Sequence, residues 1–304
     1  MRQRPARRRF RHRALPVAGR AIVPMYNYGA QVAKPTAQAH GAETQAAKPE
    51  TNTRYAPMKS FIFCTSYIKD RDAWTHRYQR WLHYYDKMPI VAEKKIMIDD
   101  GSPFSPPREE IEVVHHSDDI AQSSARNLLV RFDDNLGRQS LSAYPGWWRS
   151  FLHSLEIAKN LGADKIIHIE SDAYILSRRL VDFINNVDSG WHVLWAQRYA
   201  LPETAIQVIC RDQFPAFERF KNESDELIQQ DIAERLLPFT SVGKQFKGDR
   251  YSEFKRNRGI FRSQKFNRIP LFQHDFFWEP IPDDADFATQ VVGRQKVEFR
   301  SQAA

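Results

Sequence analysis

The chain has 304 residues, of which 42% are hydrophobic, and it carries a formal net charge of +8. This length and composition allow one large α/β domain, or two smaller ones, with a substantial core. No run of 18 or more apolar residues occurs, which argues against a membrane-spanning helix. The two cysteines, Cys64 and Cys210, suit a reducing compartment and give neither a disulfide framework nor the spacing of a zinc site.

The positive charge is unevenly distributed along the chain. Residues 1–57 contain 11 Lys/Arg and two acidic residues, which leaves residues 58–304 with a net charge of −1. This nearly neutral body argues against a nucleic-acid partner. A second basic segment, with nine Lys/Arg between Ser241 and Ile269, is either a solvated stretch or a contact for phosphate, charged glycan or anionic membrane lipid.

Residues 1–57 show no sustained hydrophobic period, and we predict a disordered basic tail there. Met58 begins "MKSFIFCTSY", which has the form of a native start that leads directly into a first strand. We therefore expect the folded domain to span residues 58–304.

From Met58 onward, short apolar runs alternate with helical patterns. The patterns predict strands at 60–67, 94–100, 110–116 and 165–171, helices at 72–87, 145–162 and 177–187, and two further strands within 190–214. Strands that alternate with helices indicate a mostly parallel sheet that is covered on both faces. In such sheets, ligands bind beyond the carboxyl ends of the strands.

Three of the predicted strands end in polar residues at that edge. They end at Thr65–Ser66–Tyr67, at Asp99–Asp100 and at Glu170–Ser171–Asp172. We expect these groups to converge on one crevice.

The pair Glu170 and Asp172 suggests a metal site. Residues two apart in an extended strand point to the same side, and two neighbouring carboxylates repel each other unless a cation or a proton lies between them. Mg²⁺ or Mn²⁺, arriving with a diphosphate, would supply the missing positive charge. The alternative, which the spacing leaves open, is that both carboxylates meet water or cap the following turn.

The order of these motifs resembles that of the GT-A glycosyltransferases, especially the group whose second strand ends in "VDDGS". Asp99–Asp100–Gly101–Ser102 matches that motif residue by residue, and Asn135 and Gly137 match the "NxG" element of the family. Glu170–Ser171–Asp172 matches the metal-binding Asp-x-Asp motif with one conservative change. The resemblance covers roughly Ser60 to Asn185.

The resemblance implies an α/β GT-A (Rossmann-like) fold with a mostly parallel central sheet and helices on both faces. It implies a nucleotide-sugar-binding half at residues 58–185 and an acceptor-binding half at residues 186–304. The donor-binding residues it implies are Thr65, Ser66, Tyr67, Asp99, Asp100, Arg149 and Ser171. The metal ligands it implies are Glu170, Asp172 and His274.

The sequence departs from the family in several places. Of the usual "PxYN" at the end of the first strand, Tyr67 alone is kept, and some ten extra residues separate "NLG" from the next helix. The family's "ARN" in that region is absent. Arg149 is either a replacement for its arginine near the diphosphate or an exposed helix residue. His274, in "PLFQHDFFWEP", is either a metal or diphosphate contact or a structural histidine.

An inverting sugar transfer needs a base that deprotonates the acceptor hydroxyl. The stretch "QDIAERL" resembles the element that carries this base in the family, with Gln230 in place of the first acid, and Asp231 is the candidate base. Asp225 and Glu226 compete with it, and a solvated acidic helix face would explain all three. A retaining enzyme would not need Asp231 in this role.

The sequence therefore predicts a Mn²⁺- or Mg²⁺-dependent glycosyltransferase of the hexosyltransferase type. It would move sugar from a nucleoside diphosphate sugar to a hydroxyl of a glycan or glycolipid, in bacterial surface-polysaccharide assembly. We expect a cytoplasmic protein, with peripheral contact at the inner membrane as an open possibility. The alternatives are a non-catalytic sugar-nucleotide- or glycan-binding protein of the same fold, and a sugar nucleotidyltransferase, whose glycine-rich loop is missing from "CTSYIKDRDAW".

Overall fold

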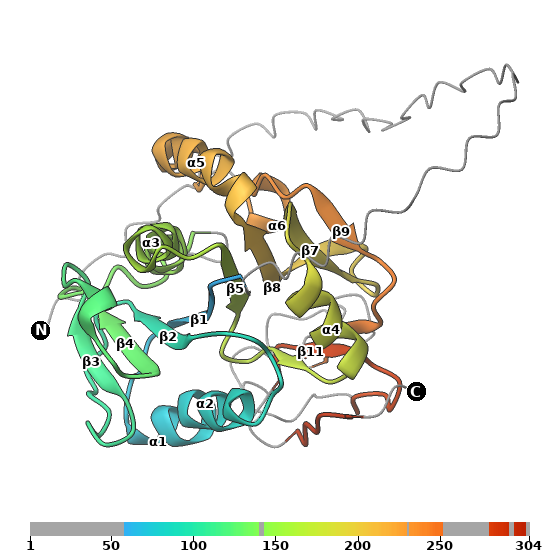
Figure 1. Cartoon of the computed structure of the whole chain (residues 1–304), viewed down its shortest axis with the longest axis horizontal. Coiled ribbons are helices and arrows are strands. Elements are labelled where there is room, and N and C mark those ends of the chain that lie inside the picture. The colour runs from blue at the N-terminus through green and yellow to red at the C-terminus, as the bar shows by residue number, and fades with distance from the viewer. Residues whose placement is uncertain (1–57, 140–142, 230, 252–279, 292–294, 302–304) are drawn as a thin grey trace, which may run out of the picture. The chain divides into compact units, whose positions relative to one another are not determined.

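The computed structural model describes residues 58–139, 143–229, 231–251, 280–291 and 295–301, without the side chains of 224–226 (Figure 1). The predicted tail, residues 1–57, and most of the second basic segment lie outside the described residues. His274 lies outside them too.

The main sheet has eight strands in the order β3-β4-β2-β1-β5-β8-β7-β9. These strands are β1 (Ser60–Ser66), β2 (Lys94–Asp99), β3 (Glu112–His115), β4 (Asn127–Arg131), β5 (Lys165–Ile169), β7 (Trp191–Ala196), β8 (Leu201–Cys210) and β9 (Ser241–Gly243). A smaller sheet has the order β10-β11-β6, formed by β10 (Gly248–Arg250), β11 (Phe287–Thr289) and β6 (Tyr174–Ile175).

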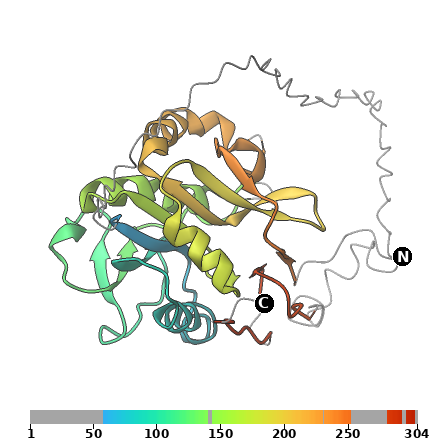
Figure 2. The same ribbon diagram turned by 45° about the vertical axis from the view of Figure 1, so that its right-hand side comes forward.

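Strands β3, β4, β2, β1 and β5 are all parallel, and β8 alone in the main sheet runs antiparallel to its neighbours β5 and β7. Helices flank this sheet (Figures 1 and 2). The predicted α/β fold, with a mostly parallel sheet and helices on its faces, is confirmed. Strands of the segments 58–185 and 186–304 hydrogen-bond to each other in this one sheet, through β5 and β8.

The helical elements are α1 (Arg71–Ala73), the π-helical turn η1 (Trp74–Tyr78), α2 (Gln79–Asp86), α3 (Pro145–Leu161), α4 (Arg178–Asn186), α5 (Phe214–Leu227) and α6 (Ala233–Leu236). Two 3₁₀ turns, η2 (Ile120–Gln122) and η3 (Arg211–Gln213), complete them. The predicted helices at 72–87, 145–162 and 177–187 are thus confirmed. Ser177 caps α4, as its side chain accepts from the Leu180 amide.

Strand β1 shows how the sequence covers both faces of the sheet. Alternate residues of a strand point to opposite faces. Ile62 and Cys64 belong to one core cluster, with residues of α2 and α4, whereas Phe61 and Phe63 belong to another, with residues of α3 and α5. A strand buried on both faces reads as a continuous apolar run, which is what "FIFC" shows.

Strand β4 was not among the predicted strands. Its sequence, "NLLVR", is a short apolar run, and such runs cannot be assigned to strand or helix by periodicity. Its pairing between β2 and β3, which is a tertiary contact, decides its conformation.

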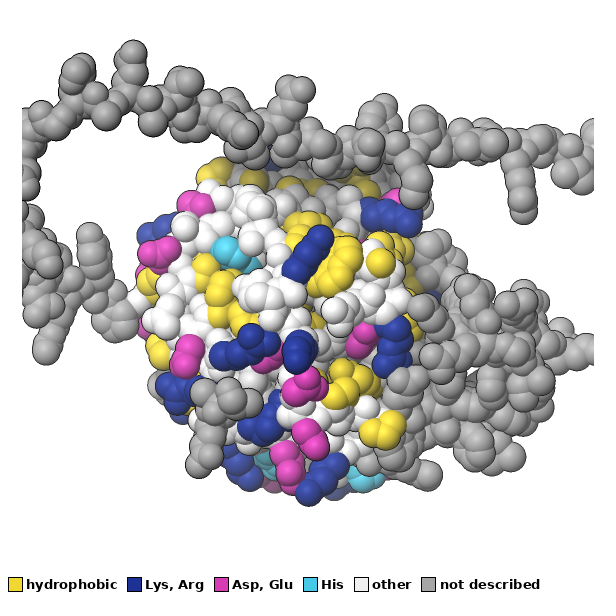
Figure 3. Space-filling model, turned by 90° about the vertical axis from the view of Figure 1, so that its right-hand side faces the viewer, with side chains coloured by type: hydrophobic (Ala, Val, Ile, Leu, Met, Phe, Trp, Pro, Cys, Tyr) yellow, Lys and Arg dark blue, Asp and Glu magenta, His cyan; other side chains and the backbone are white. Residues whose placement is uncertain are grey.

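Among the described residues, no helix has the length and apolar character needed to cross a membrane. On the face shown in Figure 3, the described Lys and Arg side chains are interspersed with Asp and Glu. This mixture agrees with the nearly neutral charge of residues 58–304.

Candidate active site

A cavity of about 490 Å³ lies at the edge of the main sheet where β1 and β5 end and the antiparallel β8 begins. It contains four of the predicted site residues, Thr65, Glu170, Asp172 and Asp231. Its other lining residues are Arg77, Arg138, Tyr144, Trp147, Trp148, Glu203, Thr204, Ala205, Ile232, Ala233, Glu234, Arg250 and Gln290. The predicted convergence of polar groups at the carboxyl edge therefore occurs for the ends of β1 and β5.

Glu170 is held as a carboxylate by three hydrogen-bond donors. The Thr65 hydroxyl lies 2.9 Å from Oε2, His168 Nε2 lies 3.0 Å from Oε1, and the Trp147 indole N–H also donates to Oε1. Burial alone would raise the pKa of Glu170, but His168 and the hydrogen bonds from Trp147 and Thr65 outweigh it and lower this pKa. Oε1 is therefore saturated, and Oε2 is the oxygen with room for a further partner.

A chain of hydrogen bonds fixes the orientation of His168. Trp191 Nε1 can act only as a donor, and it lies 2.8 Å from Gln207 Oε1. Gln207 must therefore present its amide nitrogen to His168 Nδ1, at 3.2 Å. Since Nδ1 then accepts, Nε2 carries the proton and donates to Glu170.

Asp172 has a different partner, Arg77 on the π-helical turn η1. Arg77 Nη2 lies 3.1 Å from Asp172 Oδ2, and Arg77 Nε lies 2.7 Å from the hydroxyl of Ser171. Burial raises the pKa of Asp172, and the neighbouring Glu170 adds to this effect, while Arg77 opposes it. Part of the positive charge that the acidic pair requires thus comes from a residue far away in the sequence.

The expectation that Glu170 and Asp172 point to the same side of a strand is not met. Strand β5 ends at Ile169, and the residues after Glu170 form a turn, so the two-residue period of a strand does not apply there. Glu170 contacts Trp147 on α3, whereas Asp172 contacts Arg77 on η1. Both nevertheless line the same cavity.

Asp99 is fully buried at the end of β2 and lies in a network of its own. Its side chain accepts from the hydroxyls of Ser66 and Ser102 and from the Ser102 amide, and it lies 3.9 Å from Arg131. Burial raises its pKa, against these hydrogen bonds. In this structure Asp99 and Ser66 tie the ends of β1 and β2 together, and neither lines the cavity.

Asp100 holds the loop that leads to the cavity. Its carboxylate accepts from the side chain of Asn135 at 2.8 Å and from the amide of Gly137 at 2.8 Å. Arg138, the next residue, lines the cavity. The "DDGS" and "NxG" motifs thus contact each other, and the contact positions a cavity wall.

Arg149 forms an ion pair with Asp100 and a second one, at 2.6 Å, with Asp134, and its guanidinium lies 4.2 Å from the centre of the Phe132 ring. It does not line the cavity. The alternative, an exposed helix residue, does not hold either, because the side chain of Arg149 is mostly buried, with only 19% of it exposed. Its contacts support the Asp100 loop.

Asp231 lies between α5 and α6 and lines the cavity. Its carboxylate is 3.3 Å from Arg235, and the side chain is 36% exposed. Two further acids share the cavity: Glu203, buried at the start of β8, and Glu234, both paired with Arg250. Of the competing bases, Asp225 and Glu226 have side chains outside the described part of the structure.

Two remaining donor candidates lie outside the cavity lining. Tyr67 is 45% exposed, and its backbone exchanges hydrogen bonds with the Tyr78 hydroxyl. Ser171 is buried beneath the cavity, where it accepts from Arg77. Of the two aromatic residues at the start of α3, Trp147 is half-buried and binds Glu170, while Trp148 is a core residue that also reaches the cavity wall.

The sequence interpretation missed six residues: the charged lining residues Arg77, Arg138, Glu203, Glu234 and Arg250, and the buried His168, which donates to Glu170. Two of them carried a local signal. His168 and Glu203 interrupt apolar strands, and a polar residue within a buried strand needs a partner. Nothing near Arg77 in the sequence indicates that it pairs with a residue 95 positions later.

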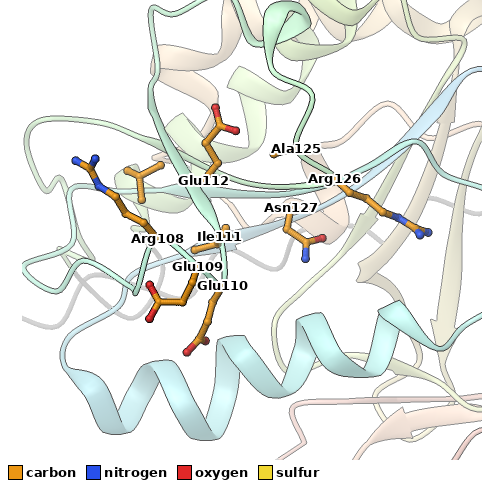
Figure 4. Close-up of a pocket in the computed structure, with 9 residues that line it drawn as sticks. Arg108, Glu109, Glu110, Ile111, Glu112, Ala125, Arg126 and Asn127 are labelled. Atoms are coloured by element: carbon orange, nitrogen blue, oxygen red, sulfur yellow. The ribbon is translucent and has the colours of Figure 1, made fainter.

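A second hollow, of about 480 Å³, lies at the opposite edge of the sheet, where β3 and β4 begin (Figure 4). Arg108 and Arg126 extend to opposite ends of it (Figure 4). Glu110 is engaged there, because it accepts from Trp74 Nε1 at 3.0 Å and from Gln79 Nε2 at 2.6 Å. The hollow is lined by the residues that lead into β3 and β4, and Glu110 ties the β3 segment to the helical segment 71–86.

Within the described part of the chain, one group of three potential metal ligands has its ligand atoms within 4.8 Å of one another, formed by His115, His116 and Asp133. It lies where β3 ends and after β4, on the surface, and it includes neither Glu170 nor Asp172. Imidazole and carboxylate together suit a transition metal such as Zn²⁺. None of the three residues lines the main cavity.

No protein-family model matches the sequence, and no curated protein does. The fold resembles that of a number of solved structures, two of which follow. One is a glycosyltransferase involved in the glycosylation of the major capsid of PBCV-1, with 10% identity, a TM-score of 0.36, and coverage of 62% of this chain and 84% of that chain. The other, assigned to the nucleotide-diphospho-sugar transferases, comes from Desulfovibrio desulfuricans G20, with 10% identity, a TM-score of 0.32, and coverage of 60% and 80%. Values this low carry no conclusion about what this chain acts on.

Proposed function

We propose that the chain is a glycosyltransferase that takes a sugar from a nucleoside diphosphate donor and transfers it to a hydroxyl of a glycan or glycolipid. The observation that carries the proposal is the cavity at the carboxyl edge of β1 and β5, which collects Thr65, Glu170, Asp172 and Asp231. This is the edge of an α/β sheet where ligands bind. The hexosyl donor and the surface-polysaccharide pathway are the parts of the proposal that come from the sequence resemblance.

The charge of the cavity suits a diphosphate accompanied by a divalent cation. Five carboxylates and three guanidinium groups line it, an excess of two negative charges when all are ionised. A diphosphate alone would increase this excess. Asp172, together with Oε2 of Glu170, would hold Mn²⁺ or Mg²⁺, and the ion would neutralise charge on the departing diphosphate.

The remaining groups have separate tasks in this proposal. His168, Trp147 and Thr65 keep Glu170 ionised and fixed, so that it reorganises little when the donor binds. Asp231, which also lines the cavity, accepts the proton of the acceptor hydroxyl if the transfer inverts the configuration. Trp147 offers an aromatic surface in the cavity on which a sugar ring can stack.

The test is a screen of the full-length chain against nucleoside diphosphate sugars, with and without Mn²⁺, followed by thermal unfolding and by donor hydrolysis. We expect one donor to raise the melting temperature and to be hydrolysed slowly in the presence of the ion. In the presence of Mn²⁺, Asp172→Asn should bind the donor with an affinity at least about tenfold lower than that of the wild type. Mn²⁺ should then no longer strengthen donor binding. Asp188→Asn, at an exposed position outside the cavity, is the matched control.

Three outcomes separate the alternatives. Binding of a nucleotide sugar without turnover would support a non-catalytic module of the same fold. Failure of every donor to stabilise the protein would contradict the proposed function. If Mn²⁺ strengthens donor binding equally in the wild type and in Asp172→Asn, Asp172 is not a metal ligand. The proposed transferase function would still stand in that case.

A further inference from the structure

Arg77 lies on an unusual stretch of backbone. The turn Trp74–Tyr78 is π-helical, and the Gln79 amide donates to the Trp74 carbonyl, five residues earlier. Such turns are rare and occur frequently at functional sites. This one interrupts the helical segment that runs from Arg71 to Asp86.

The guanidinium group of Arg77 is hydrogen-bonded along one edge and exposed along another. Ser171 binds Nε at 2.7 Å, and Asp172 binds Nη2 at 3.1 Å. The side chain is nevertheless 47% exposed and lines the cavity. Among the described residues, no hydrogen bond from Nη1 is found.

We propose that Arg77 binds the phosphate oxygens of the nucleoside diphosphate donor, an inference that rests on the proposed function. A guanidinium group is planar and offers several donors, so it can bind Asp172 along one edge and a phosphate along another. Ser171, the middle residue of the acidic motif, orients the group by accepting from Nε. Arg77 thereby brings a fixed positive charge to the position where the departing diphosphate gains negative charge.

A purely structural role for Arg77 would be the neutralisation of Asp172. The two roles differ in what happens when both charges are removed. If Arg77 only neutralises Asp172, the double variant Arg77→Ala/Asp172→Asn should recover the diphosphate affinity that Arg77→Ala loses. If Arg77 binds the phosphate, the double variant should stay weak.

The experiment uses the full-length chain and calorimetric titration with UDP, GDP, CDP and ADP in the presence of EDTA, so that no metal bridges the phosphates. The nucleoside diphosphate that binds best is the probe. We expect Arg77→Ala to weaken its binding about 10- to 100-fold, which corresponds to the loss of charged hydrogen bonds, and Arg77→Lys to weaken it less. The matching nucleoside, which has no phosphate, should bind both variants as it binds the wild type. Arg71→Ala, which removes an exposed charge six residues earlier, should have no effect.

A second measurement, the affinity for Mn²⁺, should change in the opposite direction to the affinity for the nucleoside diphosphate. Because Arg77 competes for Asp172, its removal should strengthen the binding of Mn²⁺ alone, measured by electron paramagnetic resonance, several-fold. Damage to the fold would weaken both ligands together. If Arg77→Ala does not fold, as judged by its melting temperature, Arg77→Gln, which removes the charge but keeps most of the side chain, carries both measurements.

The results that overturn the inference differ from those that overturn the proposed function. A wild type that binds none of the four nucleoside diphosphates contradicts the proposed function, and the inference with it. A wild type that binds one of them, with equal affinity in both Arg77 variants or with full recovery in the double variant, contradicts the inference alone.

Discussion

The imidazole of His168 lies 3.0 Å from the carboxylate of Glu170. His168 lies in the central strand β5 and Glu170 directly follows that strand. His168 is fully buried and stacks on Phe63, with ring centres 4.6 Å apart. It occupies a buried position of β5, between Ile167 and Ile169. The polar residue is explained by Glu170, which needs a buried donor in order to remain ionised.

We therefore predict an energetic coupling between these two residues. His168→Phe should lower the free energy of unfolding by about 1–3 kcal/mol, because it leaves Oε1 of Glu170 short of a donor. The loss should be smaller in a Glu170→Gln background, where the charge is absent. Urea unfolding of the two single variants and the double variant measures the coupling. Additive losses would show that His168 contributes packing alone.

The glycine of the "DDGS" motif should resist substitution for two reasons. Gly101 has a φ of +65°, and a Cβ there would lie 2.2 Å from the carbonyl oxygen of Asp134. Gly162 has a similar φ of +62°, but a Cβ there meets nothing within 4 Å. We expect Gly162→Ala to cost about 1 kcal/mol and Gly101→Ala more than about 3 kcal/mol. Similar losses in thermal unfolding would show that the Asp134 loop moves aside freely.

His153 on α3 should make the stability of the protein fall in mild acid. Burial, followed by the charges of His116 and Lys221, lowers its pKa from 6.5 to about 4. Between these values the unfolded chain binds a proton that the native protein does not, so the free energy of unfolding decreases as the pH falls from 6.5 to 4. The full effect is about 3 kcal/mol.

The variant His153→Gln should flatten this part of the stability profile, measured by urea unfolding at intervals between pH 7 and pH 4. His83→Gln, at an exposed position on α2, serves as the control and should keep the slope of the wild type. An unchanged slope in His153→Gln would assign the acid sensitivity to other groups.

Asp231 should matter for turnover and not for donor binding, if the transfer is inverting. Asp231→Asn keeps the size of the side chain and removes the base, and we expect kcat to fall about 10²- to 10⁴-fold. The affinity for the nucleoside diphosphate should stay within twofold of the wild type. A kcat close to that of the wild type would turn attention to Glu203 and Glu234, which share the cavity.

Local sequence determined much of the architecture. The apolar runs of β1, β2 and β5 and the helical spacing of α3 are properties of a few consecutive residues, since strand and helix periods are set by the backbone. Because parallel strands end at one edge of a sheet, the polar residues that follow β1 and β5 had to meet there. That reasoning identified Thr65, Glu170 and Asp172 as neighbours of one cavity, whereas Asp231, which also lines it, was a candidate only through the resemblance of "QDIAERL" to a family element.

Tertiary structure decided which of these polar groups face the cavity and what neutralises them. The sequence shows that the acidic pair needs a cation, but an ion pair forms between residues that packing brings together, whatever their separation along the chain. Arg77 reaches Asp172 because the helical segment 71–86 packs against the sheet, and His168 reaches Glu170 with its proton on Nε2 because Trp191 and Gln207 lie behind it. Asp99 and Asp100 show the same dependence, because their burial against Ser102 and the Asn135 loop directs both carboxylates into the protein.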